Sequence, residues 1–244
     1  MKEGRKLYLK AATAIITALY LWFIVLDFSR LSSLDYSYDI FPSGILKRLN
    51  VLLASIIAWT VGWDGLSQQD SRRMKWAFVF ACLGEAAFAF RLWIAGLAMF
   101  AVCQLLLILR NSTGLSRSLK HSTGIRKKNL LLSGIMIAIM FITGLLLSRA
   151  LTGLNSIVFA VLIYWSILNI SLFSGFSCVI LELLPRKNAA MAAAGVACFY
   201  CCDILVGLDS LLEPGLPWLL ANSFIWIFYI PALVLLSLSC FKYS

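Results

Sequence analysis

Residues 76–88 read WAFVFACLGEAAF, an apolar run that is interrupted by a single carboxylate, Glu85. A second apolar run, GVACFYCCDILV at residues 195–206, is interrupted in the same way by Asp203. Both runs are typical of membrane-spanning helices, in which an ionised side chain costs about 2.5 kcal/mol or more unless it is partnered or protonated. Glu85 and Asp203 are therefore the first candidates for function.

The rest of the sequence has the composition of a polytopic membrane protein. Of its 244 residues, 61% are hydrophobic and only 13% are charged. A transmembrane helix needs about 20 mostly apolar residues to cross about 30 Å of hydrocarbon. Eight runs meet this requirement, so we predict an all-α fold in which residues 1–244 form a single transmembrane domain, a helical bundle with eight spans. The predicted spans are residues 8–26, 46–63, 76–92, 93–109, 129–148, 155–175, 189–211 and 216–240.

Two of these boundaries need their own reasoning. The first run is followed by the charged and polar segment 27–30 rather than by a small-residue cleavage pattern, so it is expected to stay in the protein as a helix. The third and fourth runs are together too long for one crossing. A tight helical hairpin is therefore expected near residues 91–93.

Basic residues predict the orientation of the bundle, because loops rich in Lys and Arg tend to stay cytoplasmic. With both termini in the cytoplasm, sixteen Lys and Arg fall on the inner side and five on the outer side. The net charge of +10 mostly reflects this asymmetry, and the loop at residues 110–128 is expected to lie against anionic lipid headgroups. No nucleic-acid partner is needed to explain the charge.

The histidine and cysteine content argues against metal and redox chemistry. The sole histidine, His121, falls in the basic loop, so a His-based zinc site or a Ser-His-Asp triad is not expected. All seven cysteines lie in or beside apolar spans. The C-x-x-C formed by Cys198 and Cys201 is interpreted as packing inside a membrane helix. No metal and no cofactor are predicted.

Other polar residues are expected at the same depth in the membrane as the two acids. Glu85 lies about 15 Å from the inner boundary of its span, and Gln104 reaches a similar depth across the hairpin, close enough for contact. Asp203 lies about 13 Å below the outer end of its span, near the level of Tyr164 and Tyr229. The acids either hold helices together through hydrogen bonds or form an acid/base pair in a cavity open to lipid, with one protonated and the other orienting water.

Several short motifs also resemble a known family. They are Gly84-Glu85-Ala86-Ala87-Phe88, Gly96-x-x-x-Phe100-x-x-x-Gln104-Leu105, Cys202-Asp203-Ile204-Leu205-Val206-Gly207-Leu208-Asp209, and Tyr229. In this order they resemble the YhhN-like lysoplasmalogenase family of eight-span membrane proteins, and Lys47-Arg48-Leu49-Asn50 is similar to the Lys-x-x-Pro that opens the second span of that family. The chain departs from the family pattern at three positions. It has Glu85 where the family usually has Asp, Gln104 where it usually has His, and Asn50 where it usually has Pro.

The resemblance implies hydrolysis of the vinyl-ether bond of lysoplasmalogens to a fatty aldehyde and a glycerophospho-headgroup product. A vinyl ether is cleaved when its β-carbon is protonated and water then adds to the resulting cation, so one acid and one base suffice. On this interpretation Glu85 donates the proton and Asp203 positions the water, and the reverse assignment stays open. The three departures also leave open a member of the family that keeps the fold without the activity.

The resemblance further implies a set of substrate-binding residues. Lys47 or Arg48 is expected to bind the lipid phosphate, Gln104, Tyr164 and Tyr229 to line the site, and Asp209 to lie nearer the outer surface. The expected partners are a lysophospholipid substrate and membrane lipids, with the oligomeric state left open. The bacterial inner membrane is the expected location, with the endoplasmic reticulum second.

Two alternatives to a hydrolase stay open. The third and seventh spans run in the same direction, each carries one of the two acids, and each follows a basic inner loop. This pattern indicates two parallel four-helix halves, an arrangement found in some transporters. A lipid-handling or transport protein without hydrolytic activity is therefore the second hypothesis. A pure scaffold is the third, and it predicts no central cavity.

Overall fold

The computed structural model describes residues 3–33, 42–61, 64–152 and 156–243, and all of its regular elements within these ranges are α-helices. The eight long helices are α1 (Glu3–Ser33), α2 (Ser43–Trp59), α3 (Gln68–Ala89), α4 (Trp93–Asn111), α6 (Gly124–Thr152), α7 (Ser156–Ile180), α8 (Arg186–Asp209) and α9 (Leu216–Leu238). A short helix, α5 (Leu115–His121), follows α4. Each long helix overlaps one of the predicted runs, so the all-α class is confirmed, although α2, α3, α8 and α9 end two to four residues before the predicted limits. The predicted limits at residues 63 and 155 lie outside the described residues.

Most of the long helices have the length and composition of membrane spans. Within the described ranges, α1, α4, α6, α7, α8 and α9 are long and apolar enough to cross a membrane. The other two fall short for different reasons, because α2 has only 17 residues and the first half of α3 carries Asp70, Arg72, Arg73 and Lys75. The chain is a multi-pass integral membrane protein, and the crossings by α2 and α3 stay a prediction.

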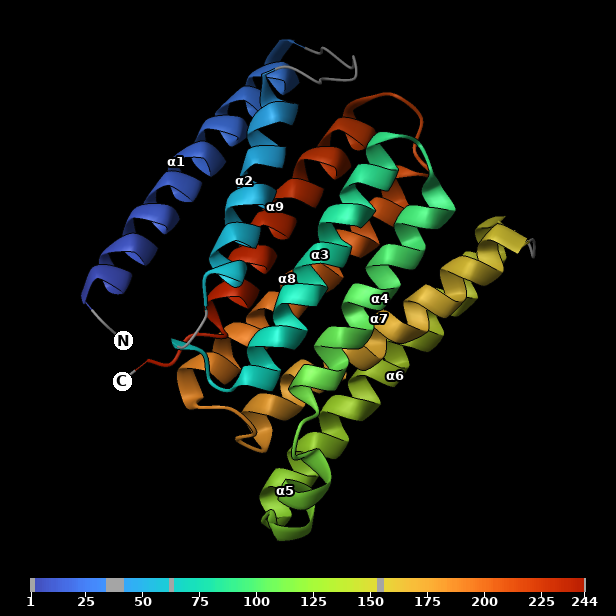
Figure 1. Cartoon of the computed structure of the whole chain (residues 1–244). Helices are drawn as coiled ribbons and strands as arrows, with labels where there is room; N and C mark the ends of the chain where they lie inside the picture. Colours follow the sequence, from blue (N-terminus) through green and yellow to red (C-terminus); the bar gives the residue numbers. More distant parts are fainter. Residues whose placement is uncertain (1–2, 34–41, 62–63, 153–155, 244) are drawn as a thin grey trace.

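Six of the long helices form a closed ring. They follow one another in the order α2, α3, α4, α7, α8 and α9, and α9 packs back against α2. The other two helices lie outside the ring, α1 against α2 and α9, and α6 against α7 (Figure 1). Glu85 and Asp203 therefore belong to ring helices, α3 and α8, that are not neighbours in the ring.

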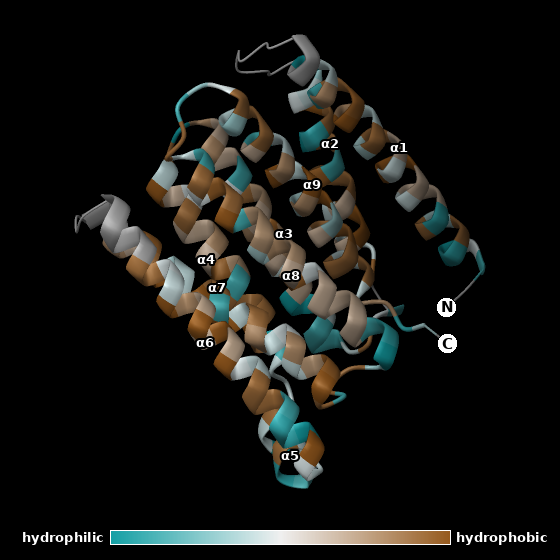
Figure 2. Cartoon of the chain, turned by 180° about the vertical axis from the view of Figure 1, so that it is seen from behind, coloured by the Kyte–Doolittle hydropathy of each residue, from teal (hydrophilic) through white to brown (hydrophobic). Residues whose placement is uncertain are grey.

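Both ends of the described chain lie at one end of the bundle, called here the termini end (Figure 1). There Arg5 Nε on α1 is 3.2 Å from the Asp64 Oδ2 atom, and the Lys242 amide donates a hydrogen bond to the Asp64 carbonyl at 2.7 Å. Hydrophilic residues gather at this end, including those of α5, whereas the middle of the bundle is mostly hydrophobic (Figure 2). The even number of long helices thus returns the chain to its starting side, and the assignment of that side to the cytoplasm stays a prediction.

The predicted hairpin between α3 and α4 is present, with residues 90–92 as its connection. Arg91 adopts a left-handed backbone conformation with φ 59° to make the reversal. A Cβ atom on Gly84 would lie 2.7 Å from the ring of Phe100, and one on Gly96 would collide with the ring of Phe88. The two glycines therefore let each helix of the hairpin accept an aromatic ring from the other.

Candidate functional site

The structure brings the two predicted acids together. Glu85 on α3 and Asp203 on α8 lie within electrostatic reach of each other, although their helices are not adjacent in the ring. Both residues are half-buried.

Each acid has a buried tyrosine beside it. The Tyr164 hydroxyl on α7 donates a hydrogen bond to Asp203 Oδ2 at 2.6 Å. The Tyr229 hydroxyl on α9 lies next to the Glu85 carboxyl but does not complete a hydrogen bond with it in the described structure. Both tyrosines were predicted to line the site, and each lies beside one of the two acids.

The walls around this pair are aromatic and apolar. The ring of Tyr229 packs edge-on against Phe199, Phe100 and Trp226, with ring centroids 5.5, 6.2 and 5.8 Å away. Such packing fixes the tyrosine and excludes water from one side of the acids. The environment therefore suits the hydrocarbon chain of a lipid.

The two cations that were predicted to bind a phosphate, Lys47 and Arg48, lie in different environments. Lys47 Nζ lies 2.6 Å from Asp27 Oδ2 on α1, and both side chains are almost fully buried. The same ammonium lies over the rings of Phe23 and Trp226. Arg48, by contrast, is exposed and within electrostatic reach of Glu85. Arg48 is thus accessible from outside the bundle, whereas Lys47 connects α1 to the ring.

Gln104 and Asp209 have partners of their own. Gln104 is fully buried, and its side-chain oxygen accepts a hydrogen bond of 2.6 Å from Ser171 on α7. This hydrogen bond goes to α7 rather than to Glu85, the contact considered from the sequence. Asp209 ends α8 and interacts with Asn222 on α9. Within the described ranges, no group of three or more His, Cys, Asp or Glu residues gathers as metal ligands.

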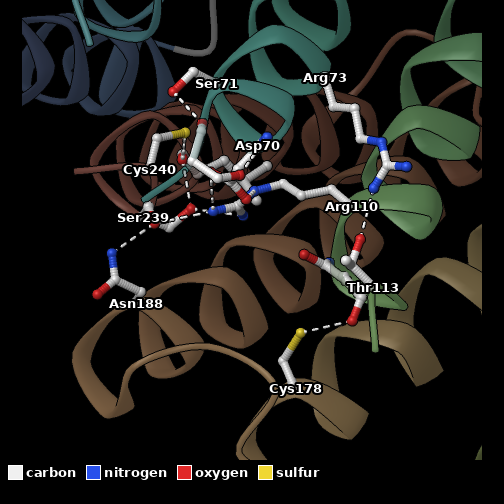
Figure 3. Close-up of polar contacts among 12 residues, drawn as sticks. Asp70, Ser71, Arg73, Arg110, Thr113, Cys178, Asn188, Ser239 and Cys240 are labelled. Carbon is white, nitrogen blue, oxygen red and sulfur yellow. Dashed lines mark hydrogen bonds and ion pairs between the residues drawn. The ribbon is translucent and has the colours of Figure 1, made fainter. Parts of the chain in front are cut away.

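A second buried polar cluster, which the sequence reasoning missed, lies at the termini end (Figure 3). Arg110 at the end of α4 is 1% exposed, and its Nε lies 2.8 Å from Asp70 Oδ1 at the start of α3. Arg110 also donates to the hydroxyl and carbonyl of Ser239, and Asn188 on α8 donates to the same carbonyl at 2.7 Å. The sequence signal was weak, since both charges lie at helix ends where exposed residues are common.

Comparison of the sequence with known protein families gives a match over most of the chain. The YhhN family profile matches residues 43–240, which run from α2 through α9 and include both acids but not α1. No curated protein matches the chain, and no solved structure matches it. The YhhN family includes lysoplasmalogenases. Because the match covers well over half of the sequence, the resemblance seen in the motifs is confirmed, and the chain belongs to the YhhN family.

Proposed function

We propose that this protein is a membrane-embedded hydrolase that cleaves the vinyl-ether bond of lysoplasmalogens. The observation that carries the proposal is the approach of Glu85 and Asp203 from two separate ring helices into one aromatic environment. Intramembrane acids at such a position mark function more often than they mark structure. Membership of a family that includes lysoplasmalogenases supports the choice of substrate.

In the first step, protonated Glu85 transfers its proton to the β-carbon of the vinyl ether. The electrons of the carbon–carbon double bond form the new C–H bond, and positive charge spreads over the α-carbon and the ether oxygen. Ionised Asp203 stabilises this cation from the other side. The hydrogen bond from Tyr164 suits this role, because it keeps the Asp203 carboxyl oriented as an acceptor.

In the second step, Asp203 accepts a proton from water as the water oxygen bonds to the α-carbon. The resulting hemiacetal collapses: the bond between the α-carbon and the glycerol oxygen breaks, the glycerol oxygen takes the hydroxyl proton, and the fatty aldehyde leaves. Asp203 then returns its proton to Glu85, which restores the starting state. Arg48 binds the phosphate of the lipid, because it is exposed and within electrostatic reach of Glu85, whereas Lys47 is already paired.

The proposed topology has eight crossings with both termini in the cytoplasm. It is supported by the packing of α2 against α9 and of α3 against α4, because α9 and α4 are long and apolar enough to cross a membrane (Figure 1). It is also supported by the sixteen basic residues assigned to the inner side against five on the outer side. We place the protein in the bacterial inner membrane, with the endoplasmic reticulum as the alternative.

The test uses the full chain, purified and reconstituted in phosphatidylcholine nanodiscs with a lysoplasmalogen. Aldehyde release is expected from the wild type and not from Glu85→Gln or Asp203→Asn, with thermal stability close to that of the wild type. Glu213→Gln is the matched control, since it removes an exposed carboxyl outside the ring, and it is expected to keep full activity. A 1-acyl lysophospholipid, which has an ester instead of the vinyl ether, is expected to remain intact.

Two results would overturn the proposal. Full activity of both acid variants would exclude the carboxylate mechanism. Binding of lysoplasmalogen by the wild type without any release of aldehyde would favour the non-hydrolytic lipid-handling protein.

A further inference from the structure

Two adjoining hollows open at the termini end of the bundle. Each has a volume of about 420 Å³, and Thr113 and Leu183 line both of them. The first hollow lies over the Asp70–Arg110 cluster and the second lies beside α5. Asp70 and Glu85 are fifteen positions apart on α3, which corresponds to about 22 Å. The hollows are therefore separate from the acid site.

The lining of the two hollows is strongly basic. It contains the cations Arg73, Arg110, Arg117, Arg126 and Lys242 and the anions Asp70 and Glu182, a formal charge of +5 − 2 = +3 with His121 neutral. Both anions are already paired, Asp70 with Arg110 at 2.8 Å and Glu182 with Arg126 at 2.7 Å. In the described part of the chain, Arg73, Arg117 and Lys242 form no ion pair.

Arg73 is positioned where the two hollows meet. Its Nη1 atom donates to the Leu109 carbonyl at 2.8 Å and to the Thr113 hydroxyl at 2.6 Å, and Thr113 lines both hollows. Figure 3 shows Arg73 beside Thr113, on the side of the cluster away from Asn188. These two bonds hold the guanidinium in place and do not use its Nε and Nη2 hydrogens. A planar fork of this kind matches the oxygens of a phosphate group.

Tyr243, which also lines the first hollow, adds no negative charge to it. Burial raises the pKa of Tyr243 to about 12, so its hydroxyl is neutral at physiological pH. The hydroxyl donates to the Leu238 carbonyl at 2.9 Å. The polar lining is therefore made of cations, paired anions and neutral groups.

We propose that the two hollows form a binding site for a phosphate group of an anionic ligand. Such a group is present both on anionic phospholipids, which are enriched at cytoplasmic membrane surfaces, and on small soluble phosphate compounds. The site lies level with the ends of the long helices, where lipid headgroups are found, and its charge complements both sources. This site goes beyond the proposed hydrolysis and does not depend on it.

The experiment measures ligand binding as a rise in melting temperature, because a ligand that binds only the folded protein stabilises it by mass action. The full chain is purified in an uncharged maltoside detergent and titrated with dioctanoyl phosphatidylglycerol, dioctanoyl phosphatidylcholine or inorganic phosphate. The double variant Arg117→Gln/Lys242→Gln removes two exposed cations that line the hollows. The double variant Arg186→Gln/Lys187→Gln is the control, since it removes two exposed cations at the same end that do not line them.

We expect phosphatidylglycerol to stabilise both the wild type and the control. We expect it to bind the Arg117/Lys242 variant at least roughly tenfold more weakly than the wild type, because each basic residue near an anionic headgroup adds to the binding affinity. A similar effect of inorganic phosphate would identify the soluble source, whereas an effect of phosphatidylglycerol alone would identify the lipid. Equal weakening in the two double variants would overturn the proposal, since it would show only the general charge of this end. Equal stabilisation of the wild type by phosphatidylcholine and phosphatidylglycerol, or by none of the three compounds, would overturn it as well.

Discussion

The Asp70–Arg110 pair offers a sharp test of what holds the termini end together. The substitution Asp70→Asn keeps the size of the side chain but removes its charge, so the guanidinium stays buried beside neutral partners only. Breaking a buried ion pair by removing one partner costs about 3–5 kcal/mol, because the other charge is left uncompensated. We expect a value near 3 kcal/mol, because the bonds of Arg110 to Ser239 remain and the Asn oxygen still accepts one hydrogen bond.

The assay is reversible unfolding of the purified protein in mixed micelles, followed by tryptophan fluorescence. The control is Glu182→Gln, which makes the same chemical change in the Arg126–Glu182 pair, whose side chains are 39% and 67% exposed. Exposed pairs contribute less than about 1 kcal/mol, because water screens both charges. If Asp70→Asn is no more destabilising than Glu182→Gln, the buried pair does not carry the stability assigned to it.

Three further changes test other parts of the structure. Lys47→Met removes the positive charge beside the buried carboxylate of Asp27 on α1. We expect a lower melting temperature and faster proteolysis between α1 and α2. Unchanged values of both would contradict the role of this ion pair. Gly84→Ala places a methyl group 2.7 Å from an aromatic ring of α4 and is expected to cost about 1–3 kcal/mol, whereas Gly207→Ala, which meets nothing within 4 Å, is expected to be nearly neutral in the same unfolding measurement. Tyr164→Phe removes a hydrogen bond to the Asp203 carboxylate and is expected to slow aldehyde release about tenfold or more. Tyr200→Phe removes a hydrogen bond to the neutral amide of Asn169 and is expected to leave the rate within about threefold of the wild type. Equal rates for the two variants would show that Tyr164 does not act in the site.

The helical fold followed from the sequence because the signal is local. A run of apolar residues long enough to span a bilayer is visible without knowledge of its neighbours, and all eight runs became long helices. The hairpin at residues 90–92 followed from length alone. The isolated carboxylates Glu85 and Asp203 were visible for the same reason, since charge stands out against an apolar background.

The buried ion pairs between distant residues were not visible in the sequence. Asp27 was interpreted as a polar flank of the first span, yet its carboxylate forms a buried pair with Lys47 and accepts a hydrogen bond from Ser43. Asp70 and Arg110 also looked like ordinary charges at helix ends, and only the packing of α3, α4 and α9 buries them together. Such pairs depend on which helix faces touch, and the composition of one helix does not determine that.

The proposed chemistry is tested most directly by aldehyde formed in D2O. If an acid protonates the β-carbon of the vinyl ether, the aldehyde released by the wild type carries one deuterium on the carbon next to its carbonyl group, as mass spectrometry of the promptly trapped product would detect. We expect this labelled product from the wild type and no aldehyde from Glu85→Gln or Asp203→Asn. Aldehyde without deuterium, or labelled aldehyde formed by either variant at the wild-type rate, would contradict the two-carboxyl mechanism.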